Sequence, residues 1–122
     1  MTNVKLISVI PILQVTNLER SVDFYTRVLG FTLDWQSGEP PMIASVYRDG
    51  ASLMLKVEAA PVLSHVYFEM TGVDEYFARA AEGGARIVTP LADRFYGMRD
   101  GRMTDPDGNE LDLGEELAVN AA

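Results

Sequence analysis

The apolar and polar positions of the chain follow the same order twice. An apolar run at 6–13 precedes a helical pattern that ends at Gly30, and a second apolar run at 64–70 precedes one that ends at Gly83 or Gly84. The two halves therefore form a repeat with an offset of about 55 residues. We expect each run to form a strand, and each periodic stretch to form a helix with a glycine after its last turn.

The helical stretches carry apolar residues three or four positions apart. These residues are Leu18, Val22, Tyr25 and Leu29 in the first half, and Val73, Phe77, Ala80 and Ala81 in the second. Such a stripe is typical of a helix that packs one face on a core. In each half a threonine precedes the stripe, and an acid (Glu19 or Asp74) follows that threonine three positions later. This spacing predicts that Thr16 and Thr71 cap the two helices.

Three strand-like runs follow each predicted helix. They lie at about 31–36, 42–48 and 51–57 in the first half, and at about 86–89, 97–104 and 109–114 in the second. The Asp49-Gly50 pair predicts a two-residue hairpin turn. The fold class is therefore α+β, with two βαβββ modules whose sheets each pack one face on a helix. Within a single domain, 1–122, we expect modules at about 5–58 and 62–116 and a short tail at 117–122.

Composition narrows the chemistry. The chain has 122 residues and no cysteine, which excludes disulfides and thiolate catalysis. Eighteen acids against ten bases give a net charge of −8, so binding to nucleic acid is not expected. No apolar run approaches the roughly 20 residues of a membrane span, and the run at 6–13 lacks the features of a signal peptide. We therefore expect a cytoplasmic protein with no membrane partner. Its single histidine is His65.

Three segments carry a resemblance to a known family. They are Val15-Thr-Asn-Leu-Glu-Arg-Ser-Val-Asp-Phe-Tyr-Thr-Arg-Val-Leu-Gly-Phe31, His65-Val-Tyr-Phe-Glu-Met70 and Asp105-Pro-Asp-Gly-Asn-Glu-Leu-Asp112. Together they resemble the glyoxalase/bleomycin-resistance/dioxygenase (vicinal oxygen chelate) superfamily, and are closest in kind to its metal-free, bleomycin-resistance-like branch. The resemblance implies two modules whose curved mixed sheets surround a cavity, in a homodimer. It also implies that modules of two chains pair in many members, so that each pocket is shared.

The resemblance also implies four ligand positions for the metal-dependent members, namely Ile10, Met54, His65 and Asp112. Isoleucine and thioether side chains do not suit hard or borderline cations, and iron sites with two histidines and one carboxylate need a second histidine. We therefore expect no cofactor. The alternative is one divalent metal ion on His65, Glu69 and Asp112, although His65 and Glu69 are about 13 Å apart along one strand.

Strand alternation places a set of side chains on the faces that look away from the helices. With the loop residues beside them, the predicted ligand-binding residues are Trp35, Tyr47, Met54, His65, Tyr67, Tyr96, Met98, Arg99, Met103 and Asp112. This mixture of aromatic, apolar and polar groups suits a small organic ligand, and an acidic chain would attract a cationic one. His65 is either a structural imidazole bonded to Asp112 or a tyrosine, or a polar contact for that ligand.

We expect the protein to bind a small organic molecule without metal, at or near the dimer interface. Sequestration of a bleomycin-type antibiotic or another natural product is the leading interpretation. The first alternative is a metal-dependent lyase, isomerase or dioxygenase with a non-standard site that uses His65 and Asp112. The second is a metal-free enzyme in which Asp112 orients His65 as a general base.

Overall fold

The computed structural model describes residues 3–118, which form two sheets, each with its own helix. The first half contains β1 (Ile12–Val15), α1 (Leu18–Asp23), a π-helical turn η1 (Phe24–Val28), β2 (Thr32–Ser37), β3 (Ile43–Arg48) and β4 (Ala51–Val57). The second contains β5 (His65–Glu69), α2 (Val73–Glu82), β6 (Arg86–Asp93), β7 (Met98–Thr104) and β8 (Glu110–Glu116). Within residues 3–118, no helix is long and apolar enough to cross a bilayer.

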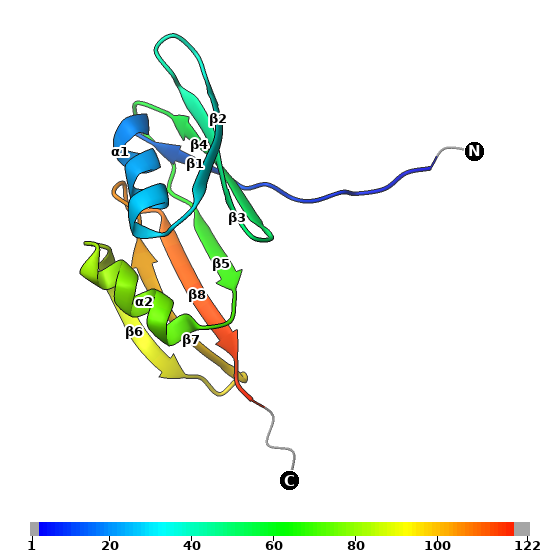
Figure 1. Ribbon diagram of the computed structural model, residues 1–122, viewed down its shortest axis with the longest axis vertical. Helices are drawn as coiled ribbons and strands as arrows, with labels where there is room; N and C mark the ends of the chain where they lie inside the picture. The colour runs from blue at the N-terminus through cyan, green and yellow to red at the C-terminus, as the bar shows by residue number, and fades with distance from the viewer. Residues whose placement is uncertain (1–2, 119–122) are drawn as a thin grey trace.

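The two sheets share one topology (Figure 1). Sheet A has the strand order β1-β4-β3-β2, and sheet B has the order β5-β8-β7-β6. In each sheet the first and last strands of the module pair in parallel, and the other pairs are antiparallel. The predicted α+β fold of two βαβββ modules is therefore confirmed. The Asp49-Gly50 turn also sets the predicted register, in which Tyr47 pairs with Ser52.

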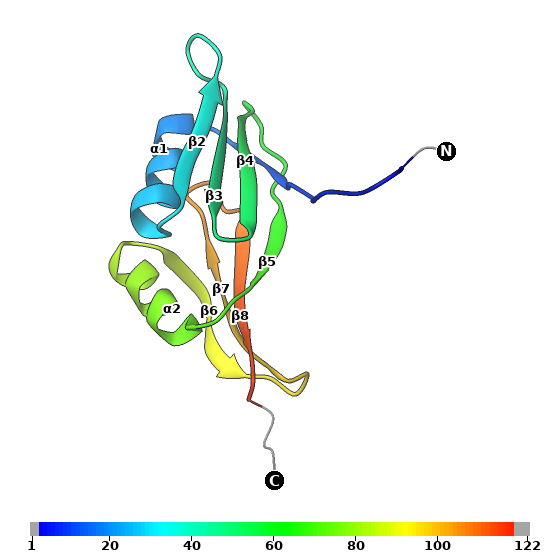
Figure 2. The same ribbon diagram turned by 45° about the vertical axis from the view of Figure 1, so that its right-hand side comes forward.

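Both helices lie on the same side of the molecule (Figure 2). The buried side chains of both halves form one cluster, which includes Leu53 and Leu55 of β4 and Leu111 and Leu113 of β8. These four leucines alternate along their strands with the more exposed Met54 and Asp112. The predicted division of β4 and β8 into two faces is thus correct, and we call the face opposite the helices the open face of each sheet.

The helices begin differently from the prediction. Asn17 is the N-cap of α1, and its side chain accepts a hydrogen bond from the backbone N–H of Arg20 at 3.0 Å. At α2 the N-cap is Gly72, with φ of 75°. A glycine has no side chain, so this residue makes no side-chain capping hydrogen bond. The backbone N–H groups of Gly72 and Val73 instead donate to Glu115 of β8, at 3.1 and 3.0 Å. A carboxylate from a distant strand thus does what Thr71 was predicted to do.

The first strand is shorter than the predicted 6–13. Residues 3–11 form no regular element, and the chain joins sheet A only at Ile12. Pro11 has no N–H to donate, so regular pairing with β4 ends there. The apolar side chains before it are open to solvent, with Leu6 94% and Val9 87% exposed. In both ribbon views this segment, which we call the N-terminal arm (residues 3–11), extends away from the helices (Figures 1 and 2).

The loop between β7 and β8 belongs to the second module and is hydrogen-bonded to the first. Asp105 Oδ1 accepts three hydrogen bonds from the backbone of its own loop, and Oδ2 accepts from Asn109 Nδ2 at 2.8 Å and from the hydroxyl of Tyr25 at 2.9 Å. Tyr25 belongs to the first module and is fully buried. Two residues later, Asp107 accepts hydrogen bonds from the backbone N–H and the hydroxyl of Thr16. Thr16, the threonine predicted to cap α1, is thus bonded to this loop. One loop therefore fixes the position of module two against module one.

We expect Tyr25→Phe to lower the free energy of unfolding by about 1–3 kcal/mol, because it leaves one buried carboxylate oxygen short of a donor. Urea denaturation followed by circular dichroism measures the change. The matched control is Tyr47→Phe, whose ring is 43% exposed; it should change stability by less than about 0.5 kcal/mol. Equal effects of the two variants would contradict the role assigned to Asp105.

Candidate functional site

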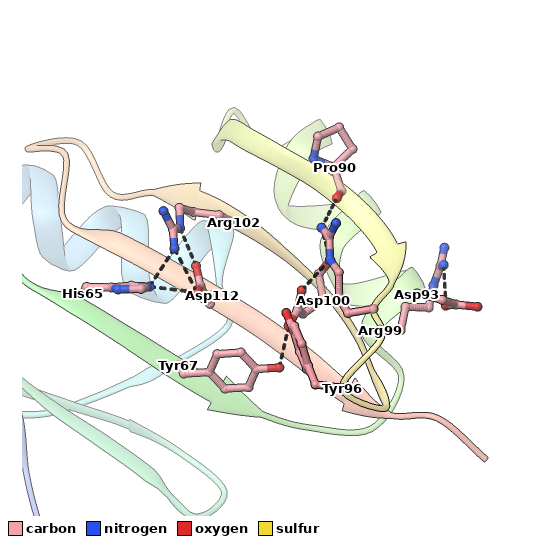
Figure 3. Close-up of polar contacts among 10 residues, drawn as sticks. His65, Tyr67, Pro90, Asp93, Tyr96, Arg99, Asp100, Arg102 and Asp112 are labelled. Carbon is pink, nitrogen blue, oxygen red and sulfur yellow. Dashed lines mark hydrogen bonds and ion pairs between the residues drawn. The ribbon is translucent and has the colours of Figure 1, made fainter. Parts of the chain in front are cut away.

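The open face of sheet B brings polar side chains from three strands together. The register places Tyr67 of β5 and Arg102 of β7 on either side of Asp112 in β8. His65 lies two residues before Tyr67 and therefore projects from the same face. Two hydrogen-bonded groups result, one around Asp112 and one around Asp100 (Figure 3).

The first group consists of His65, Arg102 and Asp112. Arg102 donates to both oxygens of Asp112, from Nε to Oδ1 at 2.7 Å and from Nη2 to Oδ2 at 3.3 Å. His65 Nε2 lies 2.8 Å from Oδ2 of the same carboxylate. Burial by itself would raise the pKa of Asp112, but the hydrogen bonds from Arg102 and His65 outweigh it and lower that pKa. Asp112 is therefore a carboxylate at neutral pH.

The contacts of His65 define what its imidazole offers to a ligand. Nε2 has two polar neighbours, the Asp112 oxygen at 2.8 Å, which accepts, and Arg102 Nη2 at 3.1 Å, which donates. A proton on Nε2 satisfies the shorter contact, and Arg102 then lies beside Nε2 without a hydrogen bond to it. In the neutral ring the other nitrogen, Nδ1, then has a free lone pair and can accept a hydrogen bond or a proton. Among residues 3–118 no serine or threonine hydroxyl is hydrogen-bonded to His65, so the group lacks the nucleophile of a covalent mechanism.

The second group is centred on Asp100. Its Oδ2 accepts from the hydroxyls of Tyr67 at 2.9 Å and Tyr96 at 2.6 Å, and its Oδ1 accepts from Arg94 Nε at 2.9 Å. Burial would raise the pKa of Asp100, but these three donors lower it. Burial and the hydrogen bond to Asp100 raise the pKa of the Tyr67 hydroxyl. Both tyrosines are therefore neutral donors held by one carboxylate.

Tyr67 reaches Asp100 because of a glycine. The phenol crosses over β8 at Gly114, and a Cβ atom built on that glycine would collide with the hydroxyl of Tyr67. Gly114 pairs with both Glu69 of β5 and Asp100 of β7, so it lies between the two strands that Tyr67 bridges. Residue 114 must therefore be a glycine for the Tyr67 ring to lie this close to the backbone of β8.

The open face of sheet A has a different chemistry. Ser45 pairs with Trp35 and Met54, and Met54 pairs with Ile12, so these four side chains share a face. Large apolar groups on it are exposed, with Trp35 at 40%, Tyr47 at 43% and Ile12 at 51%. Sheet A therefore offers an aromatic and apolar surface, whereas sheet B offers hydrogen-bonding groups.

Two hollows lie on or beside these faces. One of about 260 Å³ is on the open face of sheet B and is lined by Thr89, Arg94, Tyr96, Asp100, Gly101, Arg102 and Asp112. A larger one of about 570 Å³ lies between the modules, where Phe31 and Arg48 of the first half approach Phe68 and Tyr76 of the second. Arg48 stacks on the Tyr76 ring at 5.1 Å, and both side chains donate to the carbonyl of Leu29. No pattern in the sequence predicts this second hollow.

Most of the predicted ligand-binding residues, whether placed by alternation or expected near strand ends and loops, lie on or beside the open faces. Those on or beside the open faces are Trp35, Tyr47, Met54, His65, Tyr67, Tyr96, Met98 and Asp112. Two placements are wrong. Met103 is completely buried in the core beside Leu111, and Arg99 points to the helix side, where it forms ion pairs with Asp74 and Asp93.

Three residues of the candidate site were not predicted, namely Arg94, Asp100 and Arg102. Alternation along 98–104 contained the signal, because Met98, Asp100 and Arg102 share one face and Arg99 and Met103 share the other. The sequence does not determine how β7 pairs with β8, because the loop between them has five residues and is compatible with more than one register.

The described residues do not fit a divalent metal ion. Within residues 3–118 no three histidine, aspartate or glutamate side chains gather closely enough to hold one. Both oxygens of Asp112 are already bonded by Arg102. The alternative set of His65, Glu69 and Asp112 is therefore not brought together, and Met54 and Ile10 supply no donor that such an ion prefers.

Comparison with known proteins agrees with this architecture. The sequence model of the family described as Glyoxalase/Bleomycin resistance protein/Dioxygenase superfamily matches residues 6–113. Uncharacterized proteins of Mycobacterium bovis and Mycobacterium tuberculosis are 35% identical over 91 residues, which is 75% of this chain and 56% and 50% of those proteins. The chain thus spans about half the length of the curated relatives it matches.

Solved structures share the fold. TioX from Micromonospora sp. ML1 superposes with a TM-score of 0.81 at 27% identity, covering 88% of this chain and 97% of that one. The bleomycin resistance determinant encoded on the transposon Tn5 has a TM-score of 0.80 at 17% identity, covering 93% of this chain and 100% of that one. At the lower identity the likeness concerns the fold alone.

The lowered pKa of Asp112 predicts acid sensitivity. The unfolded chain binds a proton at this group near pH 4, before the folded chain does, so its contribution to stability is present at pH 7 and is lost as the pH falls below about 4. We expect Asp112→Asn to cost about 1 kcal/mol at pH 7, a value that solvent screening keeps small. The difference in the free energy of unfolding between wild type and Asp112→Asn should be smaller at pH 3 than at pH 7.

Urea denaturation at pH 7 and pH 3 measures this gap. Asp34→Asn, an exposed position on β2, controls for the loss of one negative charge. A gap for Asp112→Asn that stays constant between the two pH values would contradict the prediction.

Proposed function

Because the chain belongs to the Glyoxalase/Bleomycin resistance protein/Dioxygenase superfamily, we propose that it binds a small organic molecule, without a metal ion, between open faces of its sheets. The biological role that follows is sequestration of a bleomycin-type antibiotic or a related natural product. In this role the protein neutralises the molecule by binding it and does no chemistry on it.

The observation that carries the proposal is the exposed aromatic surface on sheet A. Trp35 and Tyr47 are 40% and 43% exposed there, beside Met54 and Ile12. A clustered apolar surface of this kind on a small protein marks a place where something binds. Flat aromatic rings favour a planar partner, and a methionine adapts to its outline.

The open face of sheet B supplies the polar contacts of the same site. His65 offers Nδ1 as an acceptor, and the network around Asp100 is rigid because three donors fix one carboxylate. The net charge of −8 favours a cationic ligand. The family to which the chain belongs is named in part for bleomycin resistance proteins, which supports this ligand class.

We further propose that two copies of the chain form a homodimer in which open faces of the two protomers face each other. Both helices cover the same side of the molecule, which leaves both open faces uncovered (Figure 2). A partner would bring an aromatic face of one protomer opposite a polar face of the other. The N-terminal arm supports this assembly, because Leu6, Ile7 and Val9 are more than four-fifths exposed on the open side. Extended, its nine residues reach about 30 Å, far enough to lie against a partner.

Titration with metal-free bleomycin tests the ligand. Trp35 is the only tryptophan of the chain, so its fluorescence reports on sheet A alone, and we expect a saturable change with one ligand per site. Tyr47→Ala should weaken binding about tenfold, since it removes one aromatic contact. Arg79→Gln, on the exposed surface of α2, is the matched control and should bind like the wild type.

Two results would overturn the proposal. If neither bleomycin nor other cationic aromatic natural products alters Trp35 fluorescence, the open face of sheet A is not the ligand surface. If the protein purifies with one equivalent of nickel, zinc, manganese or iron per chain, the metal-free reading is wrong.

Light scattering after size-exclusion chromatography tests the assembly. We expect the wild type at twice the mass of the chain, and a shift toward the monomer when Leu6→Ser and Val9→Ser are combined, because the arm then loses its apolar contacts. Lys5→Ser in the same arm should leave the dimer intact. A wild-type monomer at tens of micromolar, or a dimer insensitive to both serine substitutions, would contradict the proposed interface.

A further inference from the structure

We propose that Arg102 is the built-in cation of this site and stands where a metal ion would otherwise join His65 to Asp112. The inference rests on the proposed metal-free function and names the residue that enforces it. Arg102 is a positioning residue in this role, because it acts through the two side chains that it holds.

The contacts of one guanidinium nitrogen carry the proposal. Arg102 Nη2 lies 3.1 Å from His65 Nε2 and 3.3 Å from Asp112 Oδ2 (Figure 3). An ion shared by His65 and Asp112 on these two atoms would need Nε2 without its proton, which would have to move to Nδ1. The guanidinium nitrogen thus lies beside both donor atoms, and a positive charge already occupies the neighbourhood where a second cation would have to enter.

The remaining contacts of Arg102 fix it in place. Nε donates to Asp112 Oδ1 at 2.7 Å, and Nη1 donates to Glu110 Oε2 at 3.1 Å. The guanidinium therefore bridges two carboxylates of β8 that lie beside His65 and offsets one of their two negative charges. A guanidinium stays charged at every physiological pH, so this positive charge is permanent.

The first module reinforces the effect. Met54 of β4 corresponds to Asp112 of β8, because Met54 pairs with Ile12 and Asp112 pairs with Tyr67, and these two partners are one repeat offset of about 55 residues apart. A thioether does not attract a borderline cation such as Zn²⁺. With Arg102 bound to Asp112, the imidazole Nδ1 of His65 is what remains for an organic ligand, which must present an N–H or O–H donor there.

Zinc titration of the full chain tests the assignment. Because His65 is the only histidine, the imidazole signals in a nitrogen–proton NMR spectrum report on this residue alone. We expect Zn²⁺ to leave the wild-type signals unchanged at micromolar concentration. In Arg102→Gln, which keeps hydrogen-bonding groups but removes the charge, we expect Zn²⁺ affinity at His65 to rise at least about tenfold.

Two control variants separate charge from general structural damage. Arg102→Lys retains the positive charge and should restore exclusion of zinc. Arg94→Gln removes a charge from the same face, where Arg94 pairs with Asp100, and should leave the His65 signals insensitive to zinc. Circular dichroism and Trp35 fluorescence establish that each variant is folded.

Two outcomes would overturn the inference. One is a wild-type protein whose imidazole signals shift with micromolar Zn²⁺, a measurement that needs no variant. The other is a folded Arg102→Gln that binds zinc no better than the wild type. Neither readout uses the organic ligand, so a failure here is distinct from a failure of bleomycin to bind.

Discussion

The buried carboxylate of Asp105 is the constraint on which the arrangement of the two modules depends. It satisfies the backbone of its own loop with one oxygen and holds the hydroxyl of Tyr25 with the other. Because Tyr25 is buried in the core of the first module, this contact sets where sheet B lies relative to sheet A. The orientation of both helices to one side, and with it the exposure of both open faces, follows from that placement.

The two sheets share one topology, but their open faces carry different kinds of side chain. Duplicate modules with the same strand order present aromatic and apolar groups on sheet A but hydrogen-bonded carboxylates on sheet B. The difference comes from side chains at matching places, such as Met54 in one sheet and Asp112 in the other. A binding site assembled from both faces can therefore hold a molecule with one apolar and one polar side.

Local patterns in the sequence were enough for much of this fold. The Asp49-Gly50 turn determined a register, and that register determined which residues of β3 and β4 share a face. Prediction was wrong where long-range contacts decide the outcome. Glu115 supplies the cap of α2 from another strand, and the apolar residues Leu6, Ile7 and Val9 of the N-terminal arm are exposed and do not pack on the described core. At the site, His65 and Asp112 were found by alternation, whereas Arg102 required the register of β7 against β8.

Gly114 has a consequence for how such a site can change. The phenol of Tyr67 lies across β8 only because residue 114 has no side chain. A single added methyl group would push the ring outward, release Asp100 from one of its donors and reshape the hollow on sheet B. A one-nucleotide change from a glycine to an alanine codon thus suffices to reshape this face of sheet B, with every charged residue of the site left in place.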